Sequence, residues 1–349
     1  MKTLRIKDIC DKGSSSLKQK DVENQNGVYP VFGASGLIGK IDTYHQNKDY
    51  IAIVKDGSGI GRVTFMPAFS SVIGTLQYIL PKEGFNIKYI SYCLQSLDLA
   101  HYKQGAAIPH IYFRDYGEYE VNLEENPDDQ QRIVSYLDAE FAKIEALKAN
   151  AEKQLQAAKD LFQAALKELL TPKDGWMEKK LVEVCKEIFS GGDAPKENMS
   201  KEPTIDFGIP IYANAAEFDG LYGYTNYYRV NEPSVTIAAR GSGTGLVIKR
   251  KGAYLPIVRL IVVIPNTFIS VDYLYFALQT IRIKSNGTAI PQLTVPVVKQ
   301  YRICYPPNIT EQQRIADRLD ALSANLKALQ TNYTETITLC NDLKQALLK

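Results

Sequence analysis

Two glycine-rich segments have the residue types that could hold a phosphate group. The segment at 57–61 reads GSGIG and begins two residues after Lys55, and the segment at 241–245 reads GSGTG. Nucleotide-binding loops place such glycines at the start of a helix, whose free backbone N–H groups bind the phosphate. Here the spacing is G-x-G-x-G, and the residues that follow, RVTFM and LVIKR, are typical of strands. The spacing therefore predicts a tight turn between two strands; an enzyme that binds nucleotides in these loops is the alternative.

Residues that often carry catalysis or metal binding are few and scattered. His45, His101 and His110 have no metal-ligating neighbour at helical or strand spacing, and the five cysteines include no CxxC pair. Zinc fingers and zinc ribbons need tighter clusters of these residue types. We therefore expect no catalytic centre and no metal site in this chain. The odd number of scattered thiols and the lack of an 18-residue apolar run predict a cytoplasmic protein without a membrane span.

The sequence contains two copies of one unit. The glycine segments at 57–61 and 241–245 are separated by 184 residues. Further along, QQRIVSYLDA at 130–139 matches QQRIADRLDA at 312–321 with an offset of 182 residues. Shorter matches between these positions keep the same order. Such collinear matches indicate an internal duplication.

Each copy is expected to begin with an α+β domain. Residues 1–127 and 171–307 are rich in Gly, Pro, Tyr and β-branched residues, and short apolar runs such as YIAIVK and SVTIAA lie between turn residues. Such runs are typical of strands. One short helix is predicted at 87–97 in the first copy and another at 271–281 in the second.

Each copy ends in a segment that is expected to form one long helix. Residues 128–170 and 308–349 contain no Gly or Pro and are rich in strong helix formers. Apolar residues recur at alternating spacings of four and three, which is the pattern of a coiled-coil seam. The seam residues are Leu137, Phe141, Ile144, Ala151, Leu155, Ala158, Phe162, Ala165 and Leu169 in the first helix and Leu319, Leu322, Leu326, Leu329, Tyr333, Cys340, Leu343 and Leu347 in the second.

The order of these elements predicts their topology. The first helix leads from one domain to the other over about 60 Å, at 1.5 Å per residue. The second helix starts at the second domain and can cover the seam of the first only by running back. We therefore predict an antiparallel helix pair with a similar domain at each end and a pseudo-two-fold axis between them. Packing of both helices inside a single domain is the alternative.

The charge distribution indicates where a nucleic acid could bind. The whole chain has a formal net charge of +2, whereas residues 171–307 contain 16 Lys and Arg against 12 Asp and Glu. Around both glycine segments, basic residues alternate with Gly, Ser, Asn, Gln and Tyr, which is the mixture expected of phosphate contacts beside base-reading side chains. A solvated basic rim without a ligand has the same composition. The candidate DNA contacts are Lys40, Lys55, Ser58, Arg62, Lys103, Gln104, His110, Tyr112, Arg114, Asn214, Arg240, Ser242, Thr244, Lys249, Arg250, Lys284, Asn286 and Gln292.

This layout resembles the specificity subunit of type I restriction-modification systems. The resemblance is carried by NPDDQQRIVSYLDA at 126–139, by EQQRIADRLDA at 311–321 and by LLTPKDGWMEKKLVEV at 169–184. In the last of these, a helix ends and a Gly-Trp pair opens the second domain. The resemblance covers the whole chain and divides it into a first target-recognition domain at 1–127, a conserved helix at 128–170, a second target-recognition domain at 171–307 and a second conserved helix at 308–349.

The resemblance implies a non-catalytic subunit that recognises double-stranded DNA. Each domain would read one half of a bipartite target, and the helical pair would set the length of the unread spacer. Two modification subunits would dock on the conserved helices, with Gln130, Arg132, Gln312 and Arg314 as candidate contacts, and restriction subunits would complete the complex. S-adenosylmethionine, ATP and Mg²⁺ would bind to these partner subunits, and no cofactor to this chain. The alternative is a coiled-coil adaptor whose end domains bind protein rather than DNA.

Overall fold

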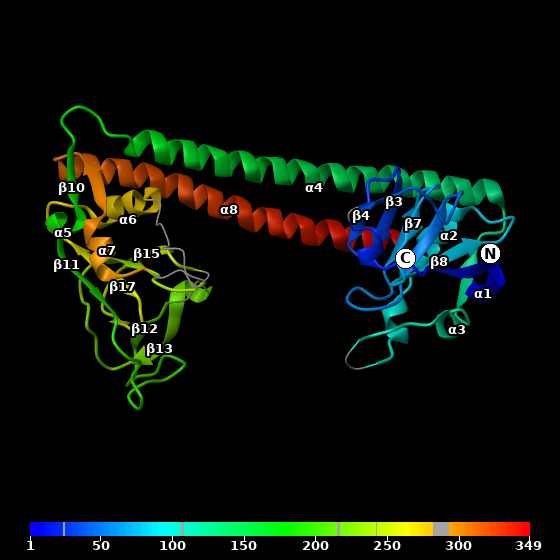
Figure 1. Ribbon diagram of the computed structural model, residues 1–349, viewed down its shortest axis with the longest axis horizontal. Helices are drawn as coiled ribbons and strands as arrows, with labels where there is room; N and C mark the ends of the chain where they lie inside the picture. The colour runs from blue at the N-terminus through cyan, green and yellow to red at the C-terminus, as the bar shows by residue number, and fades with distance from the viewer. Residues whose placement is uncertain (24, 106–107, 215–216, 242, 282–292) are drawn as a thin grey trace. The chain divides into compact units, whose positions relative to one another are not determined.

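The computed structural model describes residues 1–23, 25–105, 108–214, 217–241, 243–281 and 293–349 (Figure 1). The chain divides into two units: unit 1 comprises Met1–Ala151 and Thr334–Lys349, and unit 2 comprises Glu152–Tyr333. Each unit combines an α+β domain with a part of each long helix.

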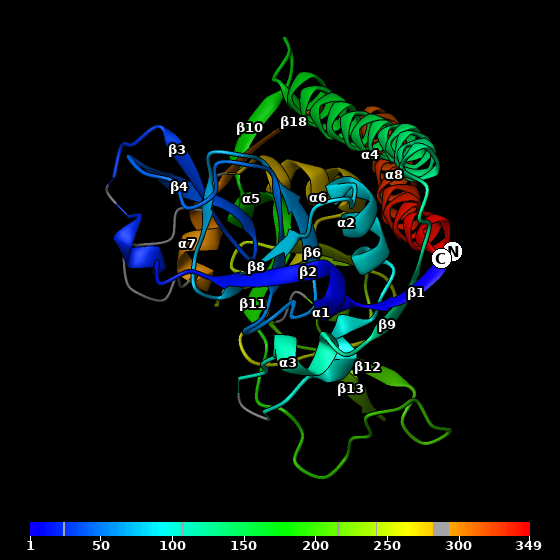
Figure 2. The same cartoon turned by 90° about the vertical axis from the view of Figure 1, so that its right-hand side faces the viewer.

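The domain of unit 1 consists of short strands and short helices. The strands are β1 (Lys2–Arg5), β2 (Cys10–Ser14), β3 (Tyr29–Gly33), β4 (Gly36–Ile41), β5 (Tyr50–Val54), β6 (Val63–Met66), β7 (Ser71–Val72), β8 (Leu76–Pro81) and β9 (Glu120–Leu123). The helices are α1 (Ile6–Ile9), α2 (Ile87–Gln95) and α3 (Phe113–Tyr116), with 3₁₀ turns η1 (Gln19–Asp21) and η2 (Leu99–Tyr102). One sheet has the strand order β2-β8-β5-β6, another has the order β4-β3-β7, and β1 lies beside β9 (Figure 2).

The domain of unit 2 repeats this arrangement. Its strands are β10 (Met177–Lys180), β11 (Cys185–Ser190), β12 (Ile209–Tyr212), β13 (Leu221–Thr225), β14 (Ser234–Ile237), β15 (Val247–Arg250), β16 (Leu255–Pro256), β17 (Ile261–Pro265) and β18 (Arg302–Tyr305). Its helices are α5 (Leu181–Val184), α6 (Val271–Thr280), α7 (Val295–Gln300) and the 3₁₀ turn η3 (Glu217–Gly220). The strand orders β11-β17-β14-β15, β13-β12-β16 and β10-β18 match those of unit 1 in topology, which confirms the internal duplication.

Strand β5 shows why the sequences of the central strands are continuous apolar runs. Successive side chains of a strand point to opposite faces of the sheet. Ile51 and Ile53 pack into the core that contains α2, whereas Ala52 and Val54 pack into the core that contains the second sheet. Because both faces of β5 are covered, a polar residue at every second position would be buried without a partner.

The two long helices are α4 (Pro127–Leu170) and α8 (Ile309–Leu348). In unit 1, Leu137 and Phe141 of α4 share a core with Cys340 of α8. In unit 2, Phe162 of α4 shares a core with Leu319 of α8. The early part of each helix therefore packs against the late part of the other, which confirms the predicted antiparallel pair. No helix in the described part of the chain is long and apolar enough to cross a membrane.

The seam differs from the prediction near the end of α8. Leu343 is 50% exposed, although the spacing placed it in the seam. Lys344 turns inward instead, with its Nζ 5.0 Å from the ring centre of Phe141. The end of α8 packs against Tyr92 of α2 as well as against α4. Contacts with both helices determine which of its residues are buried, so the burial departs from the spacing of a two-helix seam.

Candidate nucleic-acid interface

The glycine segment at 57–61 forms the turn between β5 and β6, as the sequence predicted. Gly57, Gly59 and Gly61 have φ values of 85°, 85° and 80°, in the left-handed region that favours glycine. The backbone of Ala100 also leaves no room for a side chain at Gly61, because a Cβ there would lie 2.6 Å from the Ala100 nitrogen. A strand follows this turn, so it does not provide the helix N-terminus on which phosphate loops depend.

The equivalent turn in unit 2 joins β14 to β15 and closes in the same way. Gly61 N donates to Val54 O at 2.8 Å in unit 1, and Gly245 N donates to Ala238 O at 2.8 Å in unit 2. Gly241 and Gly245 have φ values of 80° and 92°. The two turns therefore close with the same backbone hydrogen bond.

Three segments that are far apart in the sequence meet at this turn in unit 1. Gly57 N donates to the carbonyl of Pro109 at 3.0 Å, which joins the turn to the segment at 103–114. Arg62 Nη1 donates to the carbonyl of Ala34 at 2.9 Å, which joins the turn to the hairpin of β3 and β4. We call the described residues of 33–36, 55–62 and 103–114 loop cluster 1.

The predicted DNA contacts of unit 1 differ in their freedom to bind a ligand. Those in loop cluster 1 are Lys55, Ser58, Arg62, Lys103, Gln104, His110, Tyr112 and Arg114, whereas Lys40 lies outside it on β4. The Arg114 side chain is 71% exposed, and Arg62 and Lys103 are exposed as well. Gln104 is less free, because its Nε2 donates to Asp115 Oδ2 at 2.8 Å.

Lys55 and His110 both pair with Asp56, which the sequence did not single out as a contact. Lys55 Nζ donates to Asp56 Oδ2 at 2.9 Å, and His110 Nδ1 lies 2.7 Å from Asp56 Oδ1. Burial raises the pKa of the Asp56 carboxyl, but the hydrogen bonds and positive charge of His110 and Lys55 outweigh it, so this pKa lies below its usual value. Asp56 is therefore ionised at neutral pH and compensates the charge of Lys55.

Asn214, a predicted DNA contact of unit 2, hydrogen-bonds to the backbone that leads into the glycine turn. Its Nδ2 donates to Arg240 O at 2.5 Å, and its Oδ1 accepts from the backbone N–H groups of Ala239 and Arg240. Thr244, another predicted contact, donates from Oγ1 to Gly241 O at 2.8 Å. Both polar ends of Asn214 are thus used within the unit. The predicted contacts Ser242, Lys284, Asn286 and Gln292 lie outside the described residues.

Arg250, another predicted DNA contact, is buried and bonded within unit 2. It is 5% exposed, and its guanidinium carbon lies 3.6 Å from the ring centre of Tyr212. Its Nε donates to Thr236 Oγ1 at 3.1 Å, and its Nη2 donates to Asp219 O at 2.5 Å. Neighbouring residues of a strand point to opposite faces, so the basic run at 249–251 cannot be exposed throughout.

Lys249 faces the other side of this sheet, where two carboxylates neutralise it. Its Nζ lies 2.8 Å from Asp272 on α6 and 2.8 Å from Asp320 on α8. The equivalent carboxylate in unit 1, Asp138 on α4, is paired at 2.7 Å with Lys88 on α2. Each long helix therefore offers a carboxylate at the same place, and the cation comes from a different element in each unit. The charge of Lys249 anchors the domain of unit 2 to its helix.

Gln130 and Gln312, two of the predicted contacts to modification subunits, are buried and bonded within their own units. They are 1% and 0% exposed. Gln130 Oε1 accepts from Asn86 N at 3.0 Å, and Gln312 Oε1 accepts from Ser270 N at 2.8 Å. Asn86 and Ser270 are the N-caps of α2 and α6. These glutamines thus hold each long helix to the domain that precedes it in the chain. A polar residue at the start of a helix gives no sign of this role in the sequence.

Gln312→Ala is expected to lower the free energy of unfolding of unit 2 by about 2 kcal/mol, because the buried Ser270 N–H loses its acceptor. Gln312 Nε2 also donates to Phe268 O at 3.1 Å and to Pro306 O at 2.9 Å, and these bonds are lost too. Trp176 is the single tryptophan and packs against the ring of Tyr273, so its fluorescence reports denaturant unfolding of this unit.

The matched control for this stability experiment is Gln163→Ala, at an exposed position of α4 in the same unit. It makes the same chemical change without a buried partner and should alter the unfolding free energy by less than about 0.5 kcal/mol. Equal effects of the two substitutions would contradict the role of Gln312 as a buried fastening.

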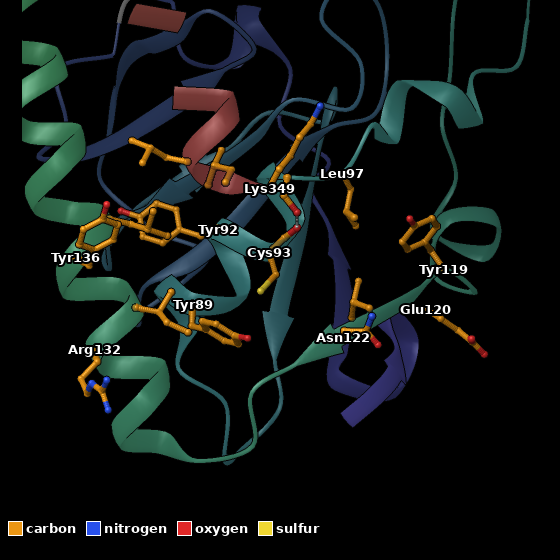
Figure 3. Close-up of a pocket in the computed structure, with 16 residues that line it drawn as sticks. Tyr89, Tyr92, Cys93, Leu97, Tyr119, Glu120, Asn122, Arg132, Tyr136 and Lys349 are labelled. Atoms are coloured by element: carbon orange, nitrogen blue, oxygen red, sulfur yellow. Dashed lines mark hydrogen bonds between the residues drawn. The ribbon is translucent and has the colours of Figure 1, made fainter. Parts of the chain in front are cut away.

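Arg132 borders a groove of about 810 Å³ in unit 1 (Figure 3). Its side chain is 82% exposed, and Tyr136, one turn later on α4, is 58% exposed. Tyr92 of α2 and Lys349 at the end of the chain also line the groove. Arg314, the counterpart of Arg132 on α8, is exposed in unit 2. Of the four predicted partner contacts, the two arginines are therefore accessible.

Two of the cysteines have thiols that stay protonated at neutral pH. The free thiols of Cys10 and Cys185 are buried, and burial raises both pKa values to about 12. Within the ranges that the structure describes, no three His, Cys, Asp or Glu side chains are grouped so that they could hold a metal ion.

Comparison with known sequences identifies the same two copies. Residues 1–157 and 173–339 match the family model described as the type I restriction modification DNA specificity domain. A putative type I specificity subunit of Mycoplasma pneumoniae, S.MpnORF507P, is 28% identical over 338 residues, which cover 92% of this chain and 89% of that protein. A second from this organism, S.MpnORF89P, is 30% identical over 302 residues, which cover 82% of this chain and 88% of that protein.

Solved structures share the fold along the full length of the chain. The crystal structure of the type I restriction-modification S subunit from M. genitalium matches with a TM-score of 0.51 and 18% identity, covering 99% of this chain and 95% of that one. A structure from work on complex assembly and conformational transition of the type I R-M system matches with a TM-score of 0.75 and 16% identity, covering 99% and 96%.

Proposed function

Because the chain belongs to the family of type I restriction-modification DNA specificity subunits, we propose that its two domains each read one half of a bipartite DNA sequence. The chain is a non-catalytic component that supplies DNA recognition. In unit 1 the reading surface is loop cluster 1, and in unit 2 it is the equivalent set of loops around the turn at 241–245. S-adenosylmethionine, ATP and Mg²⁺ bind to the partner subunits in this proposal.

The observation that carries this proposal is a shared closure of the glycine turn with different side chains beside it. The glycine turns close identically in the two units, yet the residue before the turn is Asp56 in unit 1 and Arg240 in unit 2. Exposed cations that can contact phosphates stand beside polar and aromatic side chains in loop cluster 1. A common scaffold with exchanged side chains is what two readers of different half-sites need.

We propose that two modification subunits dock on the long helices, one beside each domain. On α4 the docking surface includes Arg132, Ile133 and Tyr136, which line the groove of unit 1. Arg132 and Tyr136 are labelled in Figure 3. Ile133 and Tyr136 are 36% and 58% exposed, so they offer apolar area that a partner can cover. On α8 the equivalent surface includes Arg314. Restriction subunits join this assembly.

The helical pair sets the spacer in this proposal. Helix α4 contains 44 residues and so extends over about 66 Å. Two contacts hold each domain to its helix: the buried glutamine, Gln130 or Gln312, and the ion-paired carboxylate, Asp138 or Asp320. Domains fixed in this way hold their half-sites at a constant separation, as paired DNA readers do.

The function is tested by producing the chain with its modification subunits in a host that lacks other methylation systems. Sequencing of methylated bases should then find one bipartite target with a spacer of constant length. Methylation that requires this chain but follows no bipartite sequence would contradict the proposal. Binding of the repeated loops to protein, with no effect on DNA methylation, would favour the adaptor.

Arg114→Ala is expected to weaken binding of the assembled complex to all DNA sequences by a similar factor, because a phosphate contact carries no base information. The slope of log affinity against log salt should decrease by about 1. The measurement is a salt titration of DNA binding by fluorescence anisotropy. Lys159→Ala, at an exposed position of α4, is the control and should leave the slope unchanged. A selective loss at one base pair would instead identify Arg114 as a base reader.

A further inference from the structure

Four side chains of loop cluster 1 form a continuous row of contacts. Asp56 holds His110 Nδ1 at 2.7 Å. The His110 ring is stacked with Tyr112 at a centroid distance of 6.4 Å and an interplanar angle of 24°. The guanidinium carbon of Arg114 lies 4.8 Å from the centre of the Tyr112 ring. The row begins at the residue before the glycine turn and ends at an exposed cation.

The backbone around His110 is fixed on two sides. His110 and Gln104 exchange N–H···O bonds, each of 2.8 Å. The next residue, Ile111, donates from its backbone nitrogen to Lys55 O at 2.9 Å. The imidazole therefore has a defined position, although 38% of its side chain is exposed. A base-reading side chain needs this combination of a fixed position and an accessible polar atom.

The hydrogen bond to Asp56 also fixes the roles of the two ring nitrogens. An ionised carboxylate only accepts hydrogen bonds, so Nδ1 of His110 carries the proton that lies between them. No described residue hydrogen-bonds Nε2, the ring nitrogen on the far side from Asp56, which we call the outer nitrogen. Lys55 compensates the carboxylate, so Asp56 does not repel an approaching phosphate backbone.

We propose that His110 contacts a base edge through Nε2 and so specifies one base pair of the half-site read by unit 1. Asp56 acts as a positioning residue for the imidazole. This inference rests on the proposed DNA-recognition function and adds an individual base reader to it. A contact that the fold itself requires would be expected in both copies, but unit 2 has Arg240 at the position of Asp56. The pair therefore belongs to the part that differs between the two readers.

Two substitutions of His110 separate base reading from a structural role. His110→Asn retains a polar atom near the position of Nδ1, where it can still contact Asp56, and removes the outer nitrogen. His110→Gln places its amide near the position of Nε2 and loses the fixed contact to Asp56. If His110 reads a base, Asn should lower discrimination at one base pair by about tenfold, and Gln should retain more of it. If the residue only locks the loops, Asn should behave as wild type and Gln should be impaired, which would overturn the inference.

The readout is methylation of a library of randomised targets by the complex of each variant with its modification subunits. The half-site read by unit 2 is the internal control and should be unchanged. Asp56→Ala should relax the same base pair as His110→Asn, and Asp56→Asn should restore discrimination, because its Oδ1 can still accept from Nδ1. His45→Asn, which removes an imidazole hydrogen-bonded to Tyr78 at 3.0 Å, should relax no base pair.

The outcomes distinguish this inference from the function on which it rests. Sequence-independent methylation by the wild-type complex would contradict the proposed function. Specific methylation by wild type, with the same preferences in both His110 variants, would overturn the inference alone. Relaxation at every base pair of the half-site would also overturn it, because that result indicates a misplaced domain and not a lost base contact.

Discussion

A chain in which residues 177–307 replace residues 2–125 is expected to direct methylation to two inverted copies of the half-site that unit 2 reads. The two domains share one topology, and each meets its long helix through the same contacts. In the exchanged chain, Gln130 would accept from Ser270 N, and Asp138 would pair with Lys249, which the transplanted domain brings with it. Methylation of the original target should be lost.

The reciprocal exchange is the matched control for this prediction. Residues 2–125 in place of 177–307 should give inverted copies of the other half-site, with the same spacer. Both chains should retain complex formation, because the exposed faces of α4 and α8 are unaltered. A chain that assembles with its modification subunits but still methylates the original asymmetric target would contradict the assignment of one half-site to each domain.

Elements with a strong local pattern could be predicted from the sequence. The helix expected at 128–170 is α4 at Pro127–Leu170, and the short helix expected at 87–97 is α2 at Ile87–Gln95. Their patterns arise from residues three and four positions apart, which a linear sequence displays directly. The glycine turns were predictable for a similar reason, because the strand-like residues that follow them exclude a helix start.

Roles that depend on distant partners could not be predicted. The polar sequence around Gln130 is typical of an exposed helix start. Only its partner Asn86, 44 residues earlier, accounts for its burial. Asp56 and His110 are separated by 54 residues, and nothing in their local sequences indicates a pair. Arg250 belongs to a basic run that resembles a surface patch until the pleat of β15 turns it inward. Residue type alone therefore overestimates how many polar side chains are available to DNA.

An insertion of seven residues into both long helices is expected to lengthen the unread spacer by about three base pairs. Seven residues add about 10 Å of helix, and one base pair occupies 3.4 Å of DNA. Seven residues are one heptad, which makes two full turns of a coiled-coil helix, so the insertion preserves the phase of the seam and the apolar residues on both sides still face the partner helix. Insertion after Ala151 and after Tyr333, at the limits of the two units, leaves contacts such as Lys148 Nζ to Asn341 Oδ1 intact.

Methylated-base sequencing measures the spacer directly, and both half-sites should keep their sequences. Methylation of the original target should decrease by more than about 100-fold, because one half-site then falls out of reach and its specific contacts are lost. The control is insertion of seven residues into α4 alone, which leaves the helices unequal in length and should impair assembly. If the doubly extended chain assembles and still methylates the target with the original spacer, the separation of the half-sites is set by the DNA or by the modification subunits. If the spacer increases with helix length, the helical pair sets the distance, and the buried glutamines and paired carboxylates transmit it to the reading loops.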